Sequence, residues 1–192
     1  RAVPGDVRFV DVNGDGVIND QDRTKIGNPT PDWTLGATGS FNFKGFDINF
    51  LFTGALGHDI FKGFSRVDLR YTNRSVDFLD RWTGEGTSNT NPRYTWSDTN
   101  NNYRVSDLYI ESGSFVRLRN MQIGYTLPQS VLDRIGSTNW RFYISGENLL
   151  TLTSYSGIDP EIGAQSAFDI GIDRGVYPQA ITFRFGTSIT FY

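Results

Sequence analysis

The chain has 192 residues, a formal net charge of −3 and a pI near 5.1, and this acidic balance argues against nucleic-acid binding, which needs a basic surface. The absence of cysteine excludes disulfides and thiolate metal sites, and no apolar run approaches the ~20 residues of a membrane-spanning helix. Aromatic residues make up 15% of the chain and glycines number 21, which favours strands and turns over helices. Because the chain opens on arginine rather than methionine, we expect it to be a piece of a longer protein.

The first distinctive motif, residues 11–22, has the spacing of an EF-hand-type calcium loop. Gly16 stands where that loop turns sharply, and Asp22 replaces the usual last glutamate, as in the similar dockerin loop. A short helix over residues 20–26 should follow. The alternative is a polar turn without an ion. The expected Ca²⁺ ligands are the side chains of Asp11, Asn13, Asp15, Asn19 and Asp22 and the carbonyl of Val17.

Two alternating segments follow, at about 33–43 and 46–57, and they are joined by Lys44 and Gly45. In each segment, residues of one parity are mainly apolar or aromatic, and residues of the other are mainly small and polar. Side chains in a strand alternate between its two faces. The pattern therefore predicts a β-hairpin with a two-residue loop and two chemically distinct faces.

The alternation disappears between residues 57 and 113, where Gly, Asn, Asp, Ser and Thr are frequent. A helical turn is expected within residues 75–82. Loops of this length are usually functional. The aromatics of this stretch either form a platform that stacks on sugars or pack the loop against its neighbours, and packing is the more common role. The residues concerned are Trp82, Tyr94, Trp96 and Tyr103.

A strand resumes at about 114–126, and its apolar parity switches near Arg119 and Asn120. Either a β-bulge or a strand that leaves the membrane part-way explains the switch. Residues 129–135 then predict a short helix closed by Gly136, and a further strand is expected at about 139–150. A second irregular segment covers residues 153–177.

The last strand, at about 179–191, alternates without interruption. It meets the ~9–11 residues that a transmembrane β-strand needs. Its polar face, which includes Thr182, Arg184, Ser188 and Thr190, should face a barrel interior because a charge in hydrocarbon is costly. The side chains expected to face lipid are Ile181, Phe183, Phe185, Ile189 and Phe191.

These five strands predict an all-β fold of antiparallel, up-and-down transmembrane barrel strands with long extracellular loops. If the C-terminus is periplasmic, the turn at Lys44 and the connection 127–138 lie on the periplasmic side, and residues 1–31 and both long loops lie outside. Five strands cannot close a barrel in lipid. The chain is therefore expected to be the C-terminal portion of a larger barrel. The alternative is a soluble, calcium-stabilised β-sandwich that binds carbohydrate or acts as an adhesin.

Distinctive motifs follow one another along the chain in residues 4–19, 27–33, 109–128, 146–153 and 155–161. In this order they resemble the C-terminal region of SusC/RagA-type TonB-dependent transporters. That resemblance implies a barrel of about 22 strands with a plug. It also implies uptake of glycans or peptides, with a SusD-like surface lipoprotein, the TonB system, the remaining barrel and outer-membrane lipid as partners.

An enzyme is not expected. The single histidine, His58, gives nucleophilic catalysis of the serine–histidine type little to draw on. Asp159 and Glu161 could form a carboxylate pair, but two acids two residues apart in a glycine-rich loop more often belong to a turn.

Overall fold

The computed structural model describes residues 2–64, 73, 76–162 and 168–191. Parts of both long connections predicted from the sequence therefore lie outside the described residues. No helix among the described residues is long and apolar enough to cross a membrane. The elements are strands β1 (Trp33–Phe43), β2 (Phe46–Leu56), β3 (Asp59–Phe61), β4 (Ile110–Ser112), β5 (Phe115–Thr126), β6 (Ser137–Thr153) and β7 (Thr182–Phe191), helix α1 (Gln129–Ile135), and 3₁₀ turns at Asp20–Asp22, Val76–Asp80 and Asp107–Tyr109.

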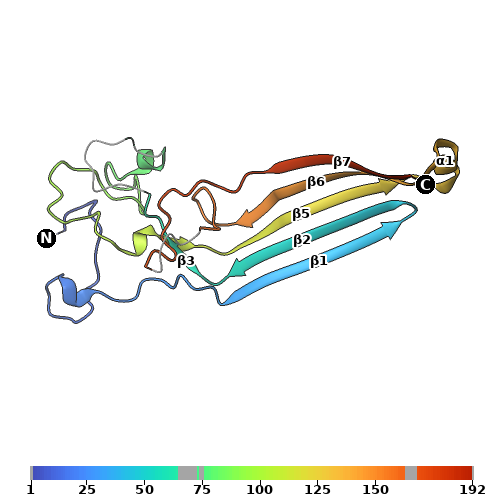
Figure 1. Cartoon of the computed structure of the whole chain (residues 1–192). Helices are drawn as coiled ribbons and strands as arrows, with labels where there is room; N and C mark the ends of the chain where they lie inside the picture. The colour runs from blue at the N-terminus through green and yellow to red at the C-terminus, as the bar shows by residue number, and fades with distance from the viewer. Residues whose placement is uncertain (1, 65–72, 74–75, 163–167, 192) are drawn as a thin grey trace.

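Five strands form one antiparallel sheet in the order β1-β2-β5-β6-β7 (Figure 1). Each strand pairs with the next long strand along the chain, so the sheet is an up-and-down meander. The short strands β3 and β4 pair only with each other in a separate two-stranded sheet. This arrangement confirms the predicted all-β, antiparallel fold class. The described strands do not build a second large sheet over the first, so the β-sandwich alternative is wrong.

The connections at one end of the sheet are short. Lys44 and Gly45 have φ values of 46° and 86°, so both central residues of the β1–β2 turn lie in the left-handed region. This is the conformation that two-residue hairpins favour, because its twist matches that of the strands. Helix α1 joins β5 to β6, buries Leu132 and ends at Gly136, whose φ is 66°. Both predictions, the two-residue hairpin and the helix closed by glycine, are confirmed.

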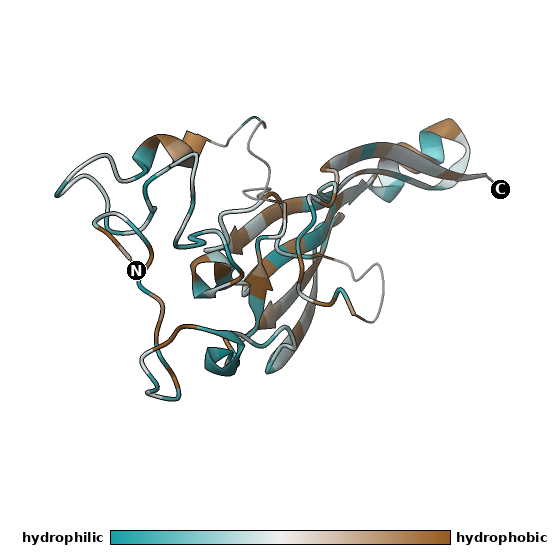
Figure 2. Cartoon of the chain, turned by 90° about the vertical axis from the view of Figure 1, so that its left-hand side faces the viewer, coloured by the Kyte–Doolittle hydropathy of each residue, from teal (hydrophilic) through white to brown (hydrophobic). Residues whose placement is uncertain are grey.

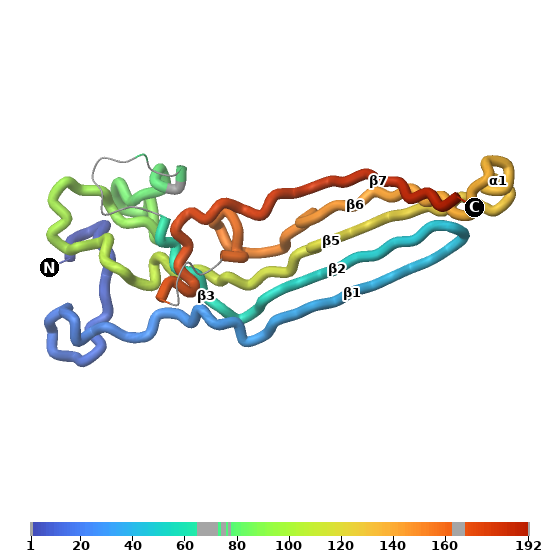
Figure 3. Tube along the Cα trace, viewed as in Figure 1, coloured from blue at the N-terminus to red at the C-terminus, as the bar shows by residue number. Residues whose placement is uncertain are grey.

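The two ends of the sheet differ in their connections (Figure 3). The β1–β2 turn, α1 and the C-terminal end of β7 gather at one end, and the N-terminal segment and the described parts of both long connections gather at the other. We call the segments at this second end the cap: residues 2–32, 57–64, 76–113, 154–162 and 168–181. Short turns on one side and long loops on the other are typical of outer-membrane barrels.

The register gives the sheet one apolar and one polar face. Ile48, Ile123 and Ile144 lie opposite one another on β2, β5 and β6, and this row continues to Phe41 on β1 and Phe185 on β7. Figure 2 shows hydrophobic and hydrophilic bands alternating along the strands. The apolar face is exposed: Phe185 is 77% accessible and Phe41 57%. A contiguous exposed apolar surface of this kind indicates contact with lipid or with another protein.

The parity switch in β5 is a bulge. Opposite β2, the register passes from Leu118 directly to Asn120, and Arg119 is the extra residue. The register between β5 and β6 shifts at the same level, where Asn148 has a φ of 54°. The bulge interpretation is therefore confirmed, and it places both Arg117 and Asn120 on the polar face.

Two local expectations need correction. The predicted helix over residues 20–26 is only a 3₁₀ turn, Asp20–Asp22, because the backbone is already extended at Arg23. None of the turn's residues is buried, so no packing supports a longer helix. The segment 57–113 was expected to lack strands, yet it contributes β3 and β4. Each has only three residues, too few for a periodic pattern to be visible.

A lysine should be tolerated differently on the two faces of β7. Phe185→Lys would place a charge on the face predicted to meet lipid, at a cost of ~2–4 kcal/mol near the membrane midplane. Ser188→Lys would place it on the polar face, where Ser188 lies opposite Arg141. We expect less heat-modifiable, folded barrel in the outer membrane for Phe185→Lys. Equal yields, or a larger loss from Ser188→Lys, would show that the faces are assigned wrongly.

Candidate functional site

The predicted calcium loop closes on itself through its carboxylates. Asp11 accepts the N–H of Gly16 at 2.7 Å. The two carboxylate oxygens of Asp22 accept the N–H groups of Val12, at 2.9 Å, and Asn19, at 2.7 Å. These hydrogen bonds lower the pKa of Asp22, and the one from the backbone N–H of Asn19 has the largest effect. The loop is therefore preorganised around an ionised Asp22.

The other expected ligands also accept hydrogen bonds within the loop. Asp15 accepts from the Asn13 amide at 3.0 Å and from the Val17 N–H at 2.8 Å, and the Val17 carbonyl accepts from the Asn19 amide at 3.3 Å. Gly16 has the positive φ, 80°, of the expected turn. In the described part of the chain, no group of three or more His, Cys, Asp or Glu could hold a metal ion as arranged. Calcium binding stays a prediction.

A buried polar network ties the N-terminal segment to the long β3–β4 connection. Asn102 is fully buried, accepts the Val7 N–H at 2.9 Å and donates to Asp6 at 2.9 Å. Asp6 also accepts from Arg93 at 2.7 Å, and its own side chain is 1% exposed. Burial opposes ionisation of Asp6, but the hydrogen bonds from Arg93 and Asn102 outweigh it and lower the pKa. Segments more than 80 residues apart are thereby held together.

Beside this network lies a groove of about 630 Å³. One wall is the N-terminal segment 5–8, and the other is the segment 88–92. Trp82 also lines the groove, and its ring lies so close to Gly5 that a Cβ on that residue would be 2.4 Å from it. The lining combines one aromatic ring with amide and hydroxyl side chains, together with the charged Asp6, Arg8 and Asp107.

The aromatics singled out in the sequence make packing contacts within the cap. Tyr94 and Trp96 have ring centroids 6.4 Å apart, and Tyr94 also meets Phe78 edge-on at 5.2 Å. Trp82 packs instead against Gly5, and Tyr103 is half-buried in the neighbouring loop. Packing within the loop thus accounts for much of this aromatic content, while Trp82 alone of the four lines the groove.

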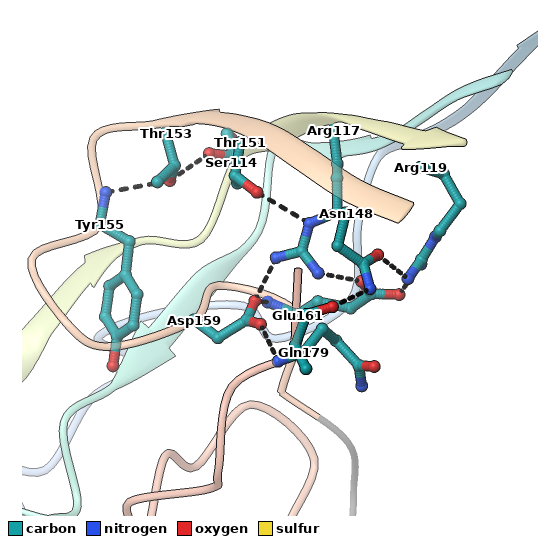
Figure 4. Close-up of polar contacts among 11 residues, drawn as sticks. Ser114, Arg117, Arg119, Asn148, Thr151, Thr153, Tyr155, Asp159, Glu161 and Gln179 are labelled. Atoms are coloured by element: carbon teal, nitrogen blue, oxygen red, sulfur yellow. Dashed lines mark hydrogen bonds and ion pairs between the residues drawn. The ribbon is translucent and has the colours of Figure 1, made fainter. Parts of the chain in front are cut away.

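On the polar face, an ion cluster joins β5 to the segment after β6 (Figure 4). Arg117 donates to Asp159 at 2.5 Å and to Glu161 at 3.0 Å, and Arg119 also pairs with Glu161. Burial alone would raise the pKa of Asp159, but hydrogen bonds from the Gln179 amide and from Arg117 lower it below its usual range. The stability that this carboxylate contributes is therefore present at neutral pH and lost only as the pH falls through that lowered pKa.

Sequence reasoning did not find this cluster, because its partners are more than 40 residues apart. Asp159 and Glu161 do more than form a turn, since each pairs with an arginine of β5. The bulge at Arg119 was the one available signal that β5 is locally irregular.

His58 is buried, and burial lowers its pKa.

Nearer the short-turn end, the polar face is flattened by glycines. Arg141 reaches Asp47 at 2.5 Å by lying across Gly124, where a Cβ would be 2.4 Å from the guanidinium. Tyr143 lies across Gly186 in the same way, with its ring 2.4 Å from the position of a Cβ. Glycine at these two positions lets the large side chains lie directly above the backbone, and a Cβ there would have to displace them.

The chain is similar to known proteins over nearly its whole length, although no known protein-family profile matches it. It is 36% identical over 196 residues to TonB-dependent receptor P3 of Formosa agariphila, and the matched region covers 98% of this chain and 19% of that protein. It is 27% identical to the TonB-dependent receptor SusC of Bacteroides thetaiotaomicron, which covers 95% of this chain and 17% of that protein.

Among solved structures, the RagAB peptide importer in its 'closed-closed' state superposes with a TM-score of 0.68 at 25% identity, over 85% of this chain and 18% of that chain. Its 'open-open' state superposes with a TM-score of 0.64. The chain thus spans about a fifth of the length of the relatives that it matches.

Loss of the Asn102 side chain should release the N-terminal segment. Asn102→Ala leaves the Val7 N–H and the buried Asp6 carboxylate each without one partner, at a cost of ~1–3 kcal/mol. We expect faster hydrogen exchange at Val7 and earlier proteolysis of residues 2–10 in the folded protein. Thr99→Ala, at an exposed position of the same loop, is the control. Unchanged protection at Val7 would contradict the anchoring role of Asn102.

Proposed function

Because the chain belongs to the SusC/RagA-type TonB-dependent receptors, we propose that it contributes five neighbouring strands to the barrel of an outer-membrane importer of glycans or peptides. The observation that carries the proposal is the five-stranded antiparallel meander, with an exposed apolar face and a polar face of hydroxyls, amides and paired charges. A sheet of this kind suits lipid on one side and a hydrated interior on the other.

The proposal includes an orientation. The turn at Lys44, helix α1 and the C-terminus would face the periplasm, and the cap would lie outside the cell. Support comes from the difference in length between the connections at the two ends of the sheet (Figure 3). The proposed partners follow from family membership: the remaining barrel and its plug, the TonB system and a SusD-like lipoprotein.

Within the cap, we propose that the groove between residues 5–8 and 88–92 contacts the lipoprotein or the transported substrate. The groove lies on the proposed outer side, and its amide, hydroxyl and aromatic lining can hydrogen-bond and stack on either a glycan or a peptide. Its walls are held in place by the buried network around Asn102. The site is therefore preorganised rather than formed on binding.

The loop 11–22 is proposed to bind one Ca²⁺ that stiffens this outer segment. The ligand spacing, the turn at Gly16 and the ionised Asp22 support the proposal. Oxygens of Asp11, Asn13, Asp15, Asn19 and Asp22 and the Val17 carbonyl would hold the ion. Calcium takes six to eight oxygen ligands, and a carboxylate oxygen that accepts one N–H still has a lone pair for a cation.

The proposed contact at the groove is tested by changing the wall formed by residues 88–92. Deletion of residues 84–91 should weaken lipoprotein association or substrate uptake, and it should leave heat-modifiable barrel assembly intact because these residues lie outside the five-stranded sheet. An equal-length replacement by Gly and Ser separates loss of the side chains from shortening of the loop. Normal association and normal uptake in both variants would count against the proposed contact.

The calcium site is tested by a pair of aspartates in the same loop. Asp15→Ala should abolish Ca²⁺ binding to the assembled transporter in calorimetry, because Asp15 stands at a ligand position. Asp20→Ala should keep it, because the exposed Asp20 pairs with Arg23 and stands at none of the expected ligand positions. If neither variant changes metal content, and chelation leaves the protease sensitivity of the loop unchanged, residues 11–22 are only a polar turn.

A further inference from the structure

The segment after β6 is bound against the polar face of the sheet. We call residues 155–161 the strap. Arg117 is 3% exposed beneath it, and donates to Asp159 at 2.5 Å, to Glu161 at 3.0 Å and to Thr151 of β6 at 2.8 Å. Figure 4 shows the arginine side chains of β5 reaching the strap carboxylates. A guanidinium that makes three such bonds in a buried position is tightly fixed.

The bulge in β5 supplies this arrangement. It inserts Arg119 next to Asn120, which remains in register with Glu147, and Arg119 donates to Asn148 on β6 while pairing with Glu161. Two arginines from one strand thus meet the two carboxylates of the strap. The four charges sum to zero, and the Arg117–Asp159 pair at the centre of the cluster is largely shielded from water.

The strap is also bonded to the cap. Tyr155 donates to Asp173 at 2.6 Å, and the N–H and hydroxyl of Ser156 both donate to Glu111 of β4 at 2.8 Å. Asp159 accepts the N–H of Gln179, just before β7, at 3.0 Å. One short segment therefore connects β5, the two-stranded β3–β4 sheet and residue Gln179, which lies just before β7.

We propose that the strap is a permanent clasp. It keeps the two-stranded β3–β4 sheet and residues 173–179 in a fixed position against the barrel wall throughout transport. A movement of these cap segments relative to the wall would either break their hydrogen bonds to the strap or pull the strap from β5 and leave Arg117 and Asp159 as unpaired charges. This proposal adds to the proposed function and rests on it in one respect: the test needs the protein assembled as an outer-membrane barrel.

A matched pair of glutamates tests the clasp in the full-length transporter. Glu161 and Glu147 are both 34% exposed and both pair with arginine on the polar face, but only Glu161 belongs to the strap. In Glu161→Gln, amide hydrogen exchange should accelerate by about tenfold or more at Ser156, Glu161 and Gln179, because charge-assisted bonds that oppose local opening are lost. In Glu147→Gln these amides should keep their wild-type rates.

If the strap holds the cap segments in place, loosening the strap should also loosen those segments. The N–H of Gly113 donates to the backbone carbonyl of His58, and the N–H of Gly175 donates to the carboxylate of Asp173. Both amides therefore report on segments that the strap holds. Their exchange should accelerate with that of the strap in Glu161→Gln. Unchanged strap exchange, the same acceleration in Glu147→Gln, or acceleration confined to the strap would each overturn the proposal.

Assembly is measured separately by heat modifiability. Failure of the wild-type protein to assemble would contradict the proposed barrel, whereas unchanged exchange in an assembled Glu161→Gln would contradict the clasp alone. Arg119→Gln serves as a second variant, because its side chain is 30% exposed and its loss leaves the buried Arg117–Asp159 pair in place. It should loosen the strap in the same direction as Glu161→Gln, and wild-type exchange in both variants would overturn the clasp.

Discussion

The constraint on which this structure depends is that backbone N–H and C=O groups in hydrocarbon must be paired, because water is not there to accept or donate. Strands β2, β5 and β6 meet it along most of their length, because each lies between two hydrogen-bonded neighbours. Strands β1 and β7 are the outer members of the sheet and each has one neighbour. In a membrane their outer edges need further strands, which agrees with relatives about five times as long as this chain.

The same environment explains how charges are placed. On the polar face, Arg141 pairs with Asp47, Arg184 with Glu147, and Arg117 with Asp159. Pairing within the wall lowers the cost of keeping these charges beside a low-dielectric layer. The glycines under Arg141 and Tyr143 let these long side chains lie flat, so the pairs occupy little of the space in front of the sheet. The apolar face, by contrast, carries exposed Phe, Ile or Leu side chains on all five strands.

The cap follows a different principle, since it is held together by polar side chains more than by a large apolar core. Ile60, Asn102 and Asp173 are among its most buried residues, and two of these three are polar. Asn102 and Asp173 each satisfy backbone or side-chain donors from distant segments. Buried polar groups are costly unless every partner is present, so such networks fix one arrangement of the loops. A groove built on this scaffold keeps its shape without a ligand.

The sequence by itself determined the elements whose information is local. Period-two alternation located the five long strands and their faces, the positive-φ demand of a two-residue turn located the hairpin at Lys44, and Gly136 marked the end of α1. The parity switch in β5 indicated either a bulge or a strand that leaves the membrane part-way, and the register showed the bulge at Arg119. Tertiary structure alone decided what that bulge is for, because Arg117 and Arg119 meet Asp159 and Glu161 only after β6 and the strap fold back over the polar face. It also decided that β3 pairs with β4 and that Asn102 joins residues 6–7 to a loop some 90 residues later. These contacts depend on which segments the sheet brings to the same end, and no periodicity along the chain records that.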